Sequence, residues 1–127
     1  NAVFGEQKQV TVPYKEDFVR RKAHYSDLYF GASLPALVQL ANKKGYDFIG
    51  VASGGINAFF VRKDLSAPFK KPSVEQAFVP SPNRDSRDEK GNLSFLPFEK
   101  RLSVIAGLPV YDIEQATTKT IRELYRL

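Results

Sequence analysis

The sequence predicts an α/β fold, because one strongly signalled helix runs directly into two short apolar segments with the composition of paired strands. The helix is expected over residues 33 to 44, where apolar side chains recur every three or four positions. The segments at residues 48 to 51 and 58 to 61 are rich in β-branched and aromatic residues and are too short to form helices of their own. A helix followed at once by a strand is typical of a layer in which the helix covers one face of a sheet.

The predicted helix has recognisable signals at both ends. Ser33 can cap the free N–H groups of the first turn, and Pro35 lies where a missing donor does no harm. Lys43 and Lys44 place positive charge on the last turn, and Gly45 follows where a left-handed residue ends many helices. These signals fix the boundaries of the helix.

The two strands are separated by the glycine-containing segment Ser53-Gly54-Gly55-Ile56-Asn57. We interpret it as the bend of a hairpin and not as a phosphate-binding loop, because no helix follows the glycines and no Lys-Ser or Lys-Thr pair is present. Two interpretations of Asn57 stay open. It is either a turn residue that tolerates left-handed backbone angles or a contact to a ligand.

The other expected elements are shorter. Residues 9 to 13 are a candidate extended piece, and residues 73 to 78 and 98 to 106 are candidate short helices. A final helix is expected within residues 117 to 127. Residues 84 to 92, in which three acidic and three basic side chains balance, predict a solvated loop whose spacing does not fit a calcium site.

Composition excludes several classes of function. The chain has no cysteine, which rules out disulfides, thiolate zinc sites and a cysteine nucleophile, and its single histidine rules out a multi-histidine metal centre. No apolar run approaches the roughly 18 residues of a membrane-spanning helix, and the first residues lack the pattern of a signal peptide. We therefore expect a cytoplasmic protein without a membrane partner or a metal. The formal net charge of +5 mildly favours anionic partners.

A long, aromatic-rich connection at residues 6 to 30 carries the polar groups best suited to chemistry. His24 has an unperturbed pKa near neutrality, which suits a general base, but a structural hydrogen bond is the favoured interpretation, because only Asp27 nearby could orient the ring. The basic run at residues 20 to 22, followed by Tyr25 and Tyr29, suits an anionic partner. A nucleic acid is not favoured as that partner, because no recognised binding motif accompanies the basic run.

Three segments of the sequence resemble the C-terminal part of bacterial FkbM-type methyltransferases, which belong to the class I family that uses S-adenosylmethionine. They are VTVPY (residues 10 to 14), KAHYSDLYFGASLPALVQLANKKGYDFIGVASGGINAFFVRKDL (residues 22 to 65) and RDSRDEKGNLSFL (residues 84 to 96). The resemblance covers most of the chain and is weaker over its last residues. It implies a Rossmann-like sheet that ends in an antiparallel β-hairpin.

On this resemblance, residues 1 to 65 are the C-terminal half of a methyltransferase-like α/β domain. Residues 1 to 4 would be the end of the fifth strand, followed by the helix and the final hairpin. Residues 66 to 127 would form a proline- and charge-rich, loop-rich extension with short helices. The chain begins with Asn and contains no Met, so we expect it to be a fragment of a longer polypeptide.

The glycine loop and acidic residue that hold the cofactor in such folds are not in this sequence. The resemblance therefore implies that S-adenosylmethionine binds to a missing N-terminal half and that this segment is inactive without it. It also implies a small hydroxylated, sugar-like methyl acceptor. Asn1, Tyr25, Tyr29 and Asn57 are the candidate acceptor contacts, and His24 is the candidate general base. The alternative is a non-enzymatic α/β module that binds an anionic partner through Arg20–Lys22 and the nearby aromatic side chains.

Overall fold

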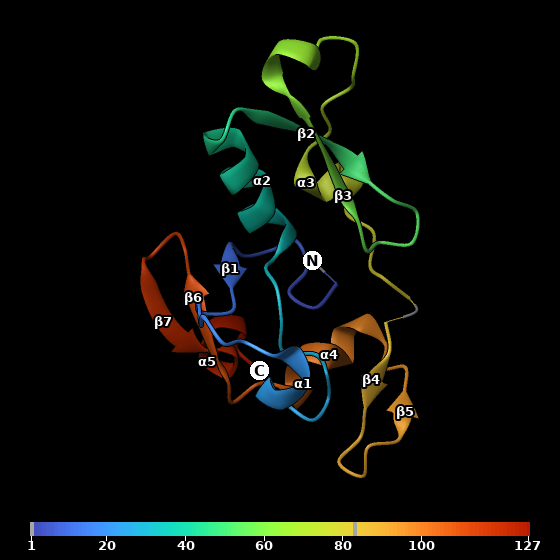
Figure 1. Cartoon of the computed structure of the whole chain (residues 1–127), viewed down its shortest axis with the longest axis vertical. Helices are drawn as coiled ribbons and strands as arrows, with labels where there is room; N and C mark the ends of the chain where they lie inside the picture. Colours follow the sequence, from blue (N-terminus) through green and yellow to red (C-terminus); the bar gives the residue numbers. More distant parts are fainter. Residues whose placement is uncertain (1, 83) are drawn as a thin grey trace.

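The structure, a computed structural model, describes residues 2 to 82 and 84 to 127 (Figure 1). Its described elements are short apart from one helix of 10 residues, α2. In chain order they are β1 (Val10–Thr11), α1 (Arg20–Ala23), α2 (Leu34–Lys43), β2 (Tyr46–Val51), β3 (Ala58–Arg62), the 3₁₀ helix η1 (Lys63–Leu65), α3 (Val74–Ala77), β4 (Ser86–Arg87), β5 (Leu93–Ser94), α4 (Phe98–Val104), β6 (Pro109–Asp112), β7 (Thr117–Thr120) and α5 (Ile121–Tyr125).

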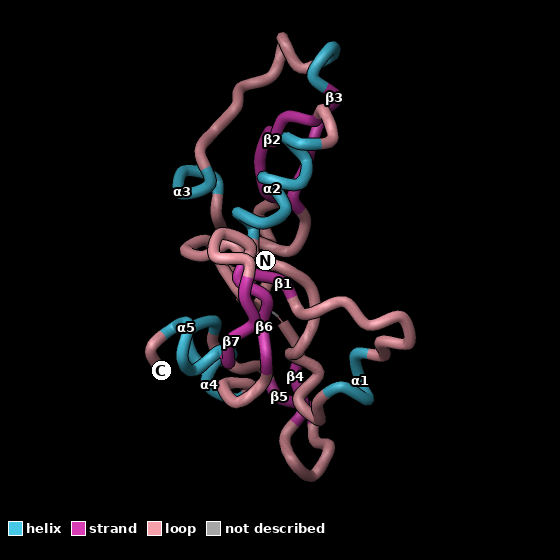
Figure 2. The backbone as a smooth tube through the Cα atoms, turned by 90° about the vertical axis from the view of Figure 1, so that its left-hand side faces the viewer, coloured by secondary structure: helices cyan, strands magenta, loops and turns pink. Residues whose placement is uncertain are grey.

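The fold is mixed α/β, with three small sheets in which every described pairing is antiparallel. One sheet has the strand order β1-β6-β7, and the other two are the hairpins β2-β3 and β4-β5. Figure 2 shows α2 and the β2-β3 hairpin in the upper part of the molecule. The β1-β6-β7 sheet lies in the lower part, with α1 on one side of it and α4 and α5 on the other.

The predicted helix and hairpin are confirmed. Ser33 caps α2, because its Oγ accepts a hydrogen bond from the backbone N–H of Ala36 at 3.3 Å. The same buried hydroxyl oxygen accepts a second hydrogen bond from the N–H of Val10 at 3.1 Å, which joins the helix to β1. The bend is closed by a hydrogen bond of 2.9 Å from the N–H of Ala52 to the carbonyl of Asn57. The glycine-containing segment is thus the turn of a hairpin.

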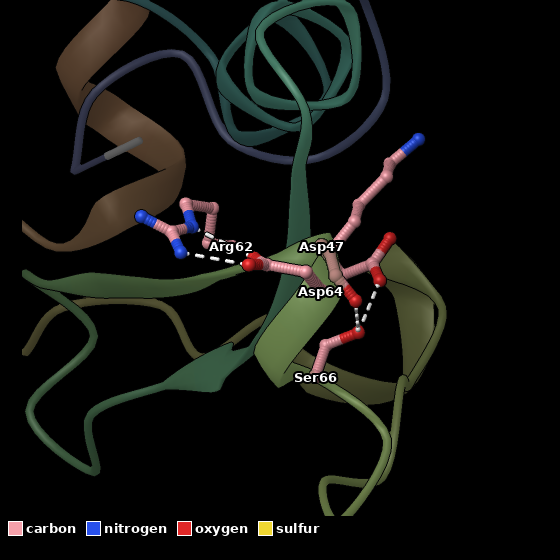
Figure 3. Close-up of polar contacts among 5 residues, drawn as sticks. Asp47, Arg62, Asp64 and Ser66 are labelled. Carbon is pink, nitrogen blue, oxygen red and sulfur yellow. Dashed lines mark hydrogen bonds and ion pairs between the residues drawn. The ribbon is translucent and has the colours of Figure 1, made fainter.

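Side-chain contacts close the other end of the β2-β3 hairpin (Figure 3). The Ser66 hydroxyl donates to Oδ2 of Asp47 at 2.7 Å, and Arg62 forms a bidentate pair with Asp64 at 2.7 Å for each hydrogen bond. The arginine pair is exposed and contributes little to stability, whereas the Ser66 bond is partly buried and orients η1 against β2.

The prediction of a strand at residues 1 to 4 was wrong for the described residues 2 to 4, which form a turn. Ala2, Val3 and Phe4 are all at most 6% exposed. Three successive buried side chains also suit a strand that is covered on both faces, so the apolar run alone does not distinguish that strand from a buried turn. The turn instead directs all three into the core.

The main hydrophobic core lies beside the β1-β6-β7 sheet and combines residues from both ends of the sequence. Its buried members are Val3, Phe4, Val10, Leu28, Tyr29, Ile105, Val110 and Ile121. Five of them precede residue 65 and three follow it. The two segments predicted on either side of that residue therefore pack around a shared core.

Two further expectations need correction. Residues 84 to 92 are not a free loop throughout, because β4 and β5 pair and the Asp88 carboxylate accepts from the N–H groups of Lys90 and Asn92 at 2.9 and 2.8 Å. These bonds close a tight turn, as aspartate side chains often do. The final helix is only α5, because residues 117 to 120 form β7, whose three threonines favour extended backbone. No helix among the described residues is long and apolar enough to cross a membrane.

Candidate functional site

The candidate functional site is a groove of about 630 Å³ beside α1. We call it the connection groove, because most of its walls come from the long connection between β1 and α2. Its lining residues are Val12, Pro13, Tyr14, Lys15, Asp17, Phe18, Val19, Lys22, Ala23, Tyr29 and Pro109. The walls thus combine aromatic rings, two lysines and one carboxylate.

Backbone hydrogen bonds hold the connection closed. The N–H of Val12 donates to the carbonyl of Gly31 at 3.0 Å, and Thr11 forms an isolated antiparallel bridge with Ala32. The two ends of the connection therefore lie next to each other, which is the geometry of a compact surface loop. Within it, the N–H of Ala23 bonds to the carbonyl of Val19 at 3.0 Å and forms the single turn of α1.

Tyr29 forms the floor of the connection groove. Only 8% of it is exposed, and its ring packs against Phe18 with centroids 6.5 Å apart. Its hydroxyl donates to the carbonyl oxygen of Pro109 at 2.6 Å. Burial raises the pKa of this phenol, so the hydroxyl stays protonated and engaged. Tyr29 therefore offers a ligand its aromatic surface.

His24 lies directly after α1 and is anchored by its Nδ1 atom. Nδ1 accepts the backbone N–H of Ser26 at 3.3 Å and lies 2.8 Å from the Ser26 Oγ. A backbone N–H can only donate, so Nδ1 must be the acceptor and the neutral ring carries its proton on Nε2. Burial lowers the pKa of His24, which favours this neutral form. In this conformation Nε2 presents a hydrogen-bond donor, and a role as general base stays a prediction that needs the other tautomer.

The structure brings only part of the predicted site together. Tyr29 lines the connection groove, whereas His24 and the half-exposed Tyr25 stack on one another, with centroids 4.3 Å apart, just beyond its lining residue Ala23. Asn57 is exposed in the β2-β3 bend and is not among the residues that line the connection groove. Asn1 lies outside the described residues.

The three cations of the basic run have different surroundings. The Arg20 Nε donates to the carbonyl of Asp27 at 2.6 Å, and Arg21 lies 3.9 Å from the Asp27 carboxylate. Lys22 lines the connection groove and has no carboxylate within ion-pair distance among the described residues. Only Lys22 of the three therefore faces this groove with an uncompensated charge.

Sequence reasoning missed several residues of the groove. Lys15, Asp17 and Pro109 gave no local signal, and Pro109 reaches the groove because β6 pairs with β1 and because its carbonyl accepts a hydrogen bond from Tyr29. Tyr14 and Phe18 belong to the aromatic-rich connection, and that enrichment is the one sequence signal that points toward them. Among the described residues, no cluster of three or more histidine, aspartate or glutamate side chains is placed to hold a metal ion.

Comparisons with known proteins leave the family open. The chain matches no protein-family model, and neither the curated proteins nor the solved structures contain a significant match to it.

Proposed function

We propose that this chain is the acceptor-side, C-terminal segment of a bacterial S-adenosylmethionine-dependent methyltransferase of the FkbM type. The observation that carries the proposal is the connection groove, because the resemblance assigns the long connection to the acceptor side. The Rossmann-like parallel sheet and the cofactor would belong to the upstream half of the full polypeptide. The order α2, β2, β3, in which a helix precedes an antiparallel hairpin, agrees with the end of such a sheet.

The lining of the groove suits a small hydroxylated acceptor. Tyr14, Phe18 and Tyr29 offer flat apolar surfaces, and Lys15 and Lys22 offer charged donors to hydroxyl oxygens. Methyl transfer requires the acceptor oxygen to align with the methyl group of the cofactor, so orientation by such walls supplies much of the rate. His24, just beyond the groove, is the proposed base if it changes tautomer.

The test is methyl transfer from labelled S-adenosylmethionine by the full polypeptide that contains this chain, offered a panel of sugars. We expect Phe18→Ala to raise the KM for the acceptor more than it lowers kcat, because it removes a binding surface and leaves the cofactor half intact. Phe95→Ala is the control, since Phe95 is 60% exposed and does not line the groove.

Two results would contradict the methyltransferase proposal. One is the absence of labelled product with every sugar while the full polypeptide binds S-adenosylmethionine. The other is a native product of 14.3 kDa in the host cell, because a chain of that mass contains no cofactor-binding half.

A second candidate function is an anion-binding module that works without a cofactor half. The observation that favours it is the uncompensated charge of Lys22, next to Arg20 and Arg21 on α1. The chain alone should then bind inorganic polyphosphate, with an affinity that falls steeply as salt is added. Lys22→Gln should reduce this salt dependence, whereas Lys90→Gln, in the exposed β4-β5 turn, should not. Binding that does not respond to salt would exclude this candidate.

A further inference from the structure

Two arginine side chains contact the same aromatic ring. The Cζ atom of Arg20 lies 4.1 Å from the centroid of the Phe30 ring, and the Cζ atom of Arg84 lies 4.6 Å from the same centroid. These distances are within the range in which a guanidinium is attracted to the face of a ring. We call these three residues the arginine clamp. Arg20 is the first residue of α1, Phe30 lies in the connection between α1 and α2, and Arg84 lies shortly before β4.

The positions of the clamp residues are fixed by the fold. The Nε of Arg20 is held by the carbonyl of Asp27 at 2.6 Å, which leaves its two terminal nitrogens without a bond to the described residues. Phe30 is half-buried and packs against the hydrophobic core. Both arginines remain partly exposed, so a ligand can reach them. Both guanidinium groups are thus positioned against the Phe30 ring before any ligand arrives.

Neither Arg20 nor Arg84 forms an ion pair with a described carboxylate, although the charges of Asp27 and Asp85 act on Arg20. Arg84 makes no ion pair with a described residue, and its Nε is buried without a hydrogen-bond partner. Burial is the largest cause that lowers the pKa of Arg20, and the charge of Arg84 is the second. Asp27 and Asp85 act in the opposite direction, and each of their effects is smaller. The pKa of buried Arg101 is lowered in the same order by burial and by Arg84, ahead of the opposing Glu99. Like charges held together in this way disfavour each other unless an anion intervenes.

We propose that the arginine clamp binds a single oxyanion, a phosphate or a carboxylate, carried by a small ligand. The planar guanidinium presents its N–H donors in a fork that matches the oxygen spacing of both groups, and Phe30 keeps the forks oriented. The terminal nitrogens of Arg20, which make no bond to the described residues, supply donors to the anion. The site does not depend on the methyltransferase proposal, and it shares only Arg20 with the polyanion candidate, so failure of polyphosphate binding leaves it standing.

The test is a titration of the ¹⁵N-labelled chain with inorganic phosphate and, separately, with sodium acetate, at constant ionic strength set with sodium chloride. We expect backbone amide shifts that saturate and are largest around Arg20, Phe30 and Arg84. Arg84→Gln should weaken the binding of the preferred anion about tenfold, as expected for the loss of one charge-assisted hydrogen bond. Arg122→Gln, on the exposed surface of α5, should leave the affinity unchanged.

The two titrations separate phosphate from carboxylate recognition, since the preferred anion gives the tighter saturation. Saturation by neither anion, or equal affinities of the Arg84→Gln and Arg122→Gln variants, overturns the proposal. If Arg84→Gln does not fold, the shifts of the unmodified chain decide instead. Shifts that are largest at Lys15 and Lys22 would place the anion in the connection groove and would also overturn the clamp.

Discussion

Tyr29 and Pro109 are joined by a hydrogen bond of 2.6 Å from the phenol to the backbone carbonyl, although 80 residues separate them. Tyr29 closes the connection before α2, and Pro109 begins β6. The bond therefore fastens the floor of the connection groove to the β1-β6-β7 sheet. The groove therefore depends on two distant parts of the chain, because its lining includes residues of the connection as well as Pro109.

Loss of this bond should destabilise the chain measurably. We expect Tyr29→Phe to lower the free energy of unfolding by about 1 kcal/mol, because the ring still fills the core while the Pro109 carbonyl loses its partly buried hydrogen bond. Urea unfolding followed by circular dichroism measures the difference. Tyr14→Phe is the matched control, since Tyr14 is 91% exposed. Equal midpoints for the two variants would show that the Tyr29 bond contributes no net stability.

Arg101 is a buried cation with a structural role. It has no exposed surface, and its guanidinium donates to the carbonyls of Leu96, Ala2 and Ser81. We expect Arg101→Leu to lower the free energy of unfolding by about 3 kcal/mol, because buried carbonyls in three separate segments lose their donor.

A second substitution separates shape from charge at this position. Arg101→Lys keeps the charge but cannot present the same fork, so its loss of stability should be smaller than that of Arg101→Leu. Arg122→Leu, at an exposed position on α5, serves as the surface control. An Arg101→Leu variant as stable as the Arg122→Leu variant would contradict the structural role.

The elements that sequence reasoning predicted correctly are those defined by local chemistry. The ends of α2 were predicted because the Ser33 cap, the early proline and the final glycine act within one turn of the helix. The short helix α3, predicted within residues 73 to 78, is also defined locally, since Ser73 and Gln76 form a reciprocal cap. The β2-β3 hairpin was recognised from two short runs of β-branched and aromatic residues around a glycine-containing bend.

The features that were missed depend on contacts between distant segments. The predicted final helix included residues 117 to 120, which form β7, because the pairing of β7 with β6 is set by the sheet and has no local signal. The burial of Arg101 has no periodic signal, since two of its three carbonyl partners, Ala2 and Ser81, come from other parts of the chain. The arginine clamp likewise joins Arg20 and Phe30 to Arg84, and a contact across such a separation is not visible in local patterns.

The bend of the β2-β3 hairpin offers a matched pair of glycines. Gly55 has a φ of 71°, and a Cβ added there would overlap the backbone of Val79 and Ser81. Gly54 has no atom within 4 Å of such a Cβ. We expect Gly55→Ala to cost about 2 kcal/mol or more of unfolding free energy, because neither the backbone angle nor the space allows a side chain. Gly54→Ala should change it by less than about 0.5 kcal/mol. Equal melting temperatures would mean that the segment at residues 79 to 81 does not pack against the bend.

The state of His24 should make stability depend on pH near neutrality. Its pKa in the folded chain is lowered from 6.5, because burial disfavours the charged ring. The unfolded chain therefore binds the proton more readily than the folded chain. The stability that depends on neutral His24 is fully present above the pKa of His24 in the unfolded chain, and it is lost as the pH falls toward the lower pKa of the folded chain. Protonation also removes the acceptor that holds the Ser26 N–H.

The measurement for His24 is a series of urea unfolding curves between about pH 7.5 and pH 5, the range that spans the ordinary histidine pKa. We expect the unmodified chain to lose stability faster on acidification than His24→Gln, whose amide does not titrate in this range. The carboxylates are the same in both proteins, so the difference between the two slopes isolates the imidazole. Parallel slopes would show that the ring titrates identically in the folded and unfolded chains. A steeper loss in the variant would reverse the sign and imply that folding favours the charged ring.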